Sequence, residues 1–88
     1  MIILNEKCYG EIALLLKDRI EGLGFFNGSV GYDTEEFYSE LTCTLIIYRD
    51  GNGRLSNVAP VWWEYHLFMS DGEQLTDFDW NEFNYFLK

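Results

Sequence analysis

The sequence predicts one α+β domain over residues 1–88, with an N-terminal helix, a three-stranded antiparallel meander and a short C-terminal helix. Apolar residues recur at helical spacing before residue 24 and alternate with polar ones along residues 37–48 and 58–69. A capping motif then precedes a last apolar cluster. The hydrophobic content of 48% is too high for a disordered chain and suits a single small core, with both helices on one face of the sheet.

The first helix begins at Asn5, whose side chain can cap it, and Glu6 follows where a negative charge favours the helix dipole. Gly22 and Gly24 end it. Its apolar stripe is expected to contain Cys8, Ile12, Leu15, Leu16, Ile20 and Leu23.

Three strands are predicted next, at residues 25–32, 37–48 and 58–69. Gly28 and Gly31 weaken the first. In the other two the odd positions form the apolar face, and in the third strand this face consists of Ala59, Val61, Trp63, Tyr65, Leu67 and Met69. Pro60 has no backbone N–H, so the third strand is expected to be an edge or to carry a bulge there.

The turn between the second and third strands fixes their register. A three-residue loop, Gly51 to Gly53 with Gly53 left-handed, pairs odd residues with odd ones. It predicts the core pairs Leu41 with Trp63, Cys43 with Val61 and Leu45 with Ala59. On the even face it predicts Glu40 opposite Glu64, Tyr38 opposite His66 and Thr42 opposite Trp62.

The last helix is predicted to open at Thr76, because residues 76–79 resemble a capping box in which Asp replaces the usual Glu. Its buried face is expected to contain Phe83, Phe86 and Leu87, together with Phe78 or Trp80.

Charge excludes some functions. The net charge is −9, and residues 55–87 contain three Trp and six carboxylates but no Lys or Arg. Such a chain is not expected to bind nucleic acid or an anionic membrane directly. No secretory leader or membrane-spanning run of about 20 apolar residues is recognised, which predicts a cytoplasmic protein with Cys8 and Cys43 reduced.

Two groups of residues are candidates for a partner surface. The first is the aromatic set on the even face, Tyr38, Tyr48, Trp62 and Phe68. If both helices cover the odd face, these side chains are exposed and form a protein interface or a homodimer contact. In the alternative arrangement, the C-terminal helix crosses over and buries them.

The second group is acidic: Asp71, Glu73, Asp77, Asp79 and Glu82. Closely spaced carboxylates can imitate the phosphates of nucleic acid and occupy a basic cleft, or they can simply form a solvated face.

No catalytic or phosphate-binding motif is present, and no cofactor is expected. The prediction is therefore a non-enzymatic interaction domain with a basic protein partner, of the inhibitor or immunity type. The rival hypothesis is a metal or small-ligand site formed by Glu40, Glu64 and His66.

Overall fold

Four antiparallel strands form one sheet in the order β1-β2-β3-β4, and two helices accompany it. The computed structural model describes residues 1–88. Along the chain the elements are α1 (Glu6–Ile20), β1 (Phe25–Asp33), β2 (Tyr38–Arg49), β3 (Leu55–Met69), β4 (Gly72–Gln74) and α2 (Trp80–Tyr85). The α+β class is thus confirmed. The predicted three-stranded sheet gains a short fourth strand, because the turn after Met69 folds the chain back onto β3.

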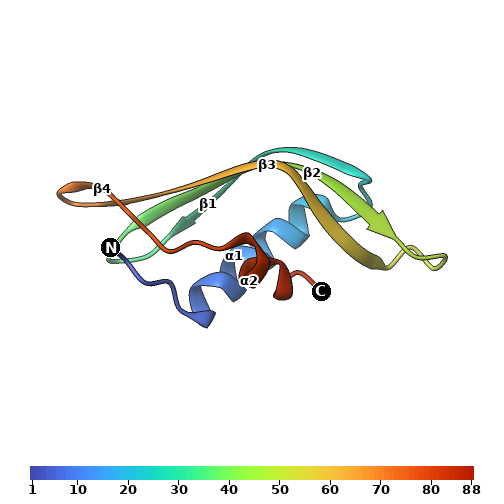
Figure 1. Cartoon of the computed structure of the whole chain (residues 1–88), viewed down its shortest axis with the longest axis horizontal. Coiled ribbons are helices and arrows are strands. Elements are labelled where there is room, and N and C mark those ends of the chain that lie inside the picture. Colours follow the sequence, from blue (N-terminus) through green and yellow to red (C-terminus); the bar gives the residue numbers. More distant parts are fainter.

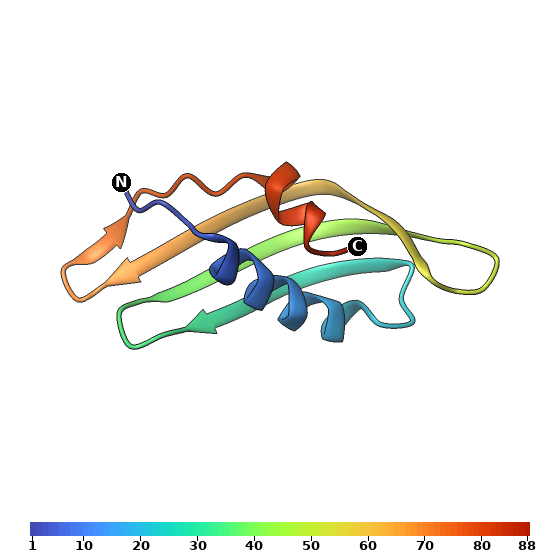
Figure 2. The same cartoon turned by 90° about the horizontal axis from the view of Figure 1, so that it is seen from below.

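Both helices lie on the same face of the sheet, and the other face is uncovered (Figure 1). Seen from the helix side, α1 lies over β1 and β2, while α2 lies beside β3 (Figure 2). The molecule is elongated along the strands, with extents of 47 × 22 × 19 Å. The core therefore consists of a single layer between the sheet and the helices.

Helix α1 begins as predicted, since the Asn5 side chain accepts a hydrogen bond from the Cys8 N–H at 2.9 Å. Its buried face includes Tyr9 and Ala13, whereas Leu15 and Leu23 are exposed. The predicted stripe was wrong at Leu15 because the buried face is centred closer to Tyr9 and Leu16, and it was wrong at Leu23 because the helix ends at Ile20.

Beyond α1, Gly22 adopts a left-handed φ of 76°. Arg49 then ties the helix to the sheet: it donates from Nη2 to the Ile20 carbonyl at 2.8 Å and from Nε to the Leu23 carbonyl at 3.1 Å.

Strand β2 runs through the middle of the sheet and alternates as predicted. Every odd-numbered residue from Ser39 to Ile47 is buried against the helices. The even-numbered residues point to the uncovered face and are at least partly exposed. This alternation fixes which side of β2 belongs to the core.

The hairpin between β2 and β3 starts in the predicted register and then departs from it. Gly53 is left-handed, with φ 79°, and Arg49 pairs with Leu55. Two irregularities follow, where β3 contains an unpaired residue: Ser56 at the first and Val61 at the second.

The two bulges correct the predicted pairs on both faces. Between them the parity is reversed, so Val58 rather than Ala59 is buried, and Val61 is 67% exposed. Beyond them odd residues pair with odd again, but two residues further along β3. The pairs observed there are Leu41 with Tyr65, Cys43 with Trp63, Tyr38 with Phe68, Glu40 with His66, Thr42 with Glu64 and Thr44 with Trp62. Leu45 pairs with Pro60 in the reversed segment between the bulges.

Pro60 lies beside the second bulge, as its missing N–H suggested. It also lies where β3 is the edge of the sheet, because β4 pairs only with Leu67 to Met69. Both conditions predicted for this proline are therefore met.

The C-terminal helix begins later than predicted. Thr76 is held extended by a parallel bridge to Ile2, and its hydroxyl accepts only from the Phe78 N–H. Asp79 caps α2 instead, accepting from the N–H groups of Asn81 and Glu82. The predicted buried face is correct for Phe83, Leu87 and Trp80, while Phe78 and Phe86 are partly buried against the core.

Candidate functional site

The candidate site is the uncovered side of the sheet, here called the open face. It consists of the even-numbered residues of β2 from Tyr38 to Tyr48 and the residues paired with them on β1, β3 and β4. Directly paired residues point to the same side of a sheet, so these side chains share one surface. Because α2 lies with α1 on the opposite side, the alternative in which it buries the even-face aromatics is wrong (Figure 1).

All four aromatic residues predicted for the partner surface lie on the open face and are exposed. Tyr38 is directly opposite Phe68 at one end of the sheet. Trp62, 48% exposed, and Tyr48, 53% exposed, lie towards the other end. Sequence reasoning missed Phe25 and Ile46, which pair with each other and also lie on the open face, towards the same end as Tyr48. The alternation within β1 was the signal for Phe25.

Gly31 makes room for the Tyr38 side chain at its end of the open face. The Tyr38 side chain reaches across β1 at Gly31, where an added Cβ would lie 2.9 Å from the Tyr38 hydroxyl oxygen. That hydroxyl donates a hydrogen bond to Glu40 at 2.9 Å. The bond to the Glu40 carboxylate raises the pKa of Tyr38. Gly31 therefore permits the tyrosine ring to lie close against the sheet.

The open face carries only acidic charge apart from His66. Its carboxylates are Asp33, Glu40, Glu64 and Glu73, and no Lys or Arg belongs to it. A one-signed field of this kind attracts cationic partners and repels nucleic acid.

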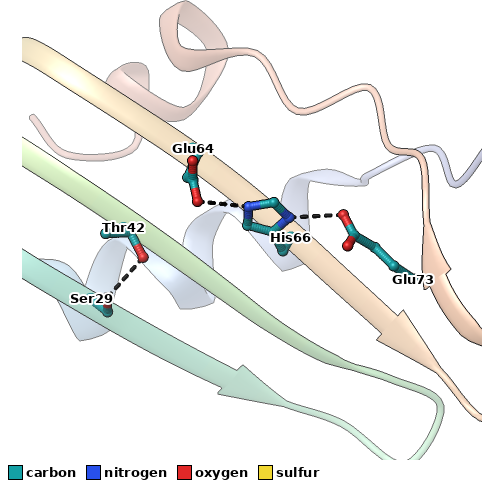
Figure 3. Close-up of polar contacts among 5 residues, drawn as sticks. All are labelled: Ser29, Thr42, Glu64, His66 and Glu73. Carbon is teal, nitrogen blue, oxygen red and sulfur yellow. Dashed lines mark hydrogen bonds and ion pairs between the residues drawn. The ribbon is translucent and has the colours of Figure 1, made fainter.

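His66 lies between two of these carboxylates (Figure 3). Its Nε2 is 2.8 Å from Glu64 Oε1, and its Nδ1 is 2.8 Å from Glu73 Oε2. A neutral imidazole has one N–H, so hydrogen bonds from both nitrogens require the imidazolium. The contacts with Glu73 first, and Glu64 second, raise the pKa of His66. Beside this group, the hydroxyls of Ser29 and Thr42 are hydrogen-bonded at 2.8 Å (Figure 3).

The structure rearranges the trio considered for a metal. Glu64 lies opposite Thr42 rather than Glu40, so the predicted pair of facing carboxylates was wrong because of the two-residue register shift. Glu40 does lie opposite His66, yet its carboxylate accepts from Tyr38. No group of three or more His, Cys, Asp or Glu side chains is arranged to hold a metal ion.

The acidic run does not form one row. Glu73 belongs to the open face, and Asp71 lies in the β3–β4 turn, where it accepts from the Gln74 side chain. Asp77 accepts from the Leu4 N–H at 2.8 Å, and Asp79 caps α2. Glu82 lies on α2, on the helix side of the sheet (Figure 2). Sequence reasoning also missed the contact between Glu73 and His66. The tight turn at Ser70-Asp71-Gly72 was its only signal.

Both cysteines are buried free thiols. Burial raises the pKa of Cys8, and it raises that of Cys43 to about 11. Thiols with raised pKa values are poor nucleophiles at neutral pH, so their contribution is to packing.

Neither helix has the length and apolar character needed to cross a membrane. Comparisons with protein-family models, with curated proteins and with solved structures give no match. The site is therefore interpreted from its own geometry and chemistry.

Proposed function

We propose that this chain is a non-enzymatic protein-interaction domain whose open face docks against a basic protein partner in the cytoplasm. The observation that carries the proposal is an uncovered sheet face with exposed aromatic side chains towards both ends, four carboxylates and no Lys or Arg. The same properties suit an inhibitor or immunity-type protein that occupies a basic, nucleic-acid-handling surface.

The aromatic residues of the open face are spread along the sheet: Tyr38 and Phe68 lie opposite each other at one end, and Trp62 and Tyr48 lie towards the other. Exposed aromatic residues such as Trp62 and Tyr48 are the residue types that most often dominate binding energy. The carboxylates around them would chiefly accelerate encounter and add salt sensitivity.

Charge also discriminates between a basic partner and a second copy of the chain. A symmetric dimer through the open face would oppose two sets of Asp33, Glu40, Glu64 and Glu73 without any Lys or Arg to offset them. Like charges brought together in an interface cost binding free energy. A basic partner removes that cost, so the heteromeric complex is favoured over the homodimer.

The test compares capture of proteins from native lysate by three immobilised forms of the chain: wild type, Trp62→Ala and Tyr85→Ala. Tyr85 is a matched control, because it is an aromatic residue that is 82% exposed on α2, away from the open face. The expected result is a basic protein retained by wild type and Tyr85→Ala, lost with Trp62→Ala, and eluted by increasing salt.

Each variant is first checked by circular dichroism and by light scattering, so that unfolding or self-association is seen separately. Equal capture by wild type and Trp62→Ala would contradict the proposal. So would a captured partner whose binding does not change with salt concentration.

A further inference from the structure

We propose that His66 acts as a proton-controlled latch, in which its imidazolium joins Glu64 to Glu73. Loss of the proton frees one of the two carboxylates and loosens β4. It also makes the open face more negative, so that a basic partner binds more tightly. The partner side of this inference rests on the proposed function. The latch itself does not, because it concerns contacts within the chain.

Both ring nitrogens of His66 lie 2.8 Å from a carboxylate oxygen. After deprotonation one nitrogen becomes a lone-pair acceptor, which repels a carboxylate at that distance. One of the two contacts must then open, so the two protonation states cannot share this geometry.

Apart from the contact between Glu73 and His66, strand β4 has few attachments to the sheet. It pairs with β3 through three residues only, Leu67 to Met69, and begins at Gly72 with φ 117°. Glu73 is the β4 residue on the open face, and its contact with His66 spans the two strands (Figure 3). Losing that contact removes the side-chain tie, so β4 is the element expected to respond.

The His66 ring is surrounded by groups from three strands. Glu64 comes from its own strand, Glu73 from β4, and Glu40 lies directly opposite on β2 with the Tyr38 hydroxyl bound to it. Phe68 stacks beside the ring at a centroid distance of 6.3 Å. The His66 side chain is 38% exposed, so solvent reaches the ring. All the charged neighbours are acidic, so they favour the imidazolium.

The protonation state of His66 sets the charge of the open face. Four carboxylates and one imidazolium give it a charge of −3, and deprotonation makes it −4. A basic partner therefore binds more tightly to the deprotonated form. By linkage, its binding lowers the pKa of His66 and releases a proton.

The latch is tested in the free protein by NMR titration, which is unambiguous because His66 is the only histidine. The expected midpoint lies above the ordinary value of about 6.5, and the backbone amides of β4 shift with the same midpoint. Glu73→Gln and Glu64→Gln should each lower the midpoint. Glu82→Gln, on α2, is the matched control and should leave it unchanged. The latch would be contradicted if the amide chemical shifts of β4 did not change with pH, or if the His66 midpoint were unchanged in Glu73→Gln.

The link to binding is tested with a nona-arginine peptide as probe, at fixed ionic strength between pH 5.5 and 8.5, where arginine does not titrate. Its affinity should rise roughly twofold to fivefold with pH, the range expected for one exposed charge contact, and the rise should be absent in His66→Gln.

The outcomes separate the two proposals. An affinity that is flat with pH in wild type, or equally pH-dependent in His66→Gln, overturns the control of binding by His66. A peptide that shifts no open-face amides and binds Trp62→Ala equally well contradicts the proposed function. In that case the titration of the free protein still tests whether the latch exists.

Discussion

Replacing each of two adjacent tryptophans by alanine tests the assignment of the two faces. Trp62 and Trp63 are neighbours on β3 but point to opposite sides of the sheet. Trp62 lies on the open face, 48% exposed. Trp63 packs against the core, with ring centroids 5.2 Å from Phe78 and 6.3 Å from Trp80. The chemistry of the two substitutions is identical, so any difference in stability reports position alone.

The magnitudes follow from burial. Truncating a buried Trp to Ala costs about 3–5 kcal/mol. Trp62 already has about half of its surface in water, so Trp62→Ala should cost about half as much, about 1.5–2.5 kcal/mol. Trp63→Ala also loses the aromatic pairs with Phe78 and Trp80, and should cost about 3 kcal/mol. A domain of 88 residues is expected to have a free energy of unfolding of about 4–13 kcal/mol, so both variants should still fold.

The assay is urea unfolding followed by far-ultraviolet circular dichroism, with the slope m compared between variants. For a protein of this size m is about 1 kcal/mol/M, so the midpoint of Trp63→Ala should lie roughly 1 M below that of Trp62→Ala. Equal midpoints, or a lower midpoint for Trp62→Ala, would refute the placement of Trp62 on the open face, and the proposed docking surface would lose its main anchor.

Two further predictions concern stability. Arg49→Lys should lower the free energy of unfolding by about 1–3 kcal/mol, because one ammonium group cannot replace guanidinium bonds to the Ile20, Leu23 and Gly53 carbonyls; an unchanged urea midpoint would contradict this. Because the pKa of His66 is raised in the folded chain, its stabilising contribution should be complete below about pH 6.5 and disappear as pH rises through the folded pKa. The melting temperatures of wild type and His66→Gln should therefore converge at alkaline pH. A difference in melting temperature that is constant with pH would argue against this stabilising contribution.

The class of fold could be predicted because its signals are local. The Asn5 cap needs only its own side chain and the Cys8 N–H three residues later. The alternation of β2 is unbroken from Ser39 to Ile47, so its buried face could be assigned without knowledge of its neighbours. The order of elements followed from these signals.

The register of β2 with β3 could not be predicted, because a bulge has little local signature. Ser56 and Val61 look like ordinary strand residues, yet each occupies β3 without a partner on β2. Only Pro60 indicated an irregularity, and it did not say how many residues were displaced. Each unpaired residue displaces every pair beyond it by one residue, so the error extended to every predicted pair.

The aromatic part of the candidate site could be predicted from the sequence, whereas the grouping of its acidic residues could not. Exposure of Tyr38, Tyr48, Trp62 and Phe68 depends on parity, which the structure preserves at these positions. Grouping of the acidic residues depends on tertiary contacts. Asp77 and Asp79 are close to Glu73 in sequence, but their carboxylates satisfy backbone N–H groups near α2. Nearness in sequence was therefore a poor guide to a shared surface.

The two bulges act as a pair, and the open face depends on that pairing. The hairpin loop sets odd residues of β3 towards the core, and the bulge at Ser56 reverses this, so that Val58 is buried. The bulge at Val61 reverses it again. Without the second bulge, Trp62, Glu64 and His66 would all point towards the helices and Trp63 would point to water. The unpaired Val61 thus places one tryptophan in the core and the other, with its acidic neighbours, on the surface proposed to meet a partner.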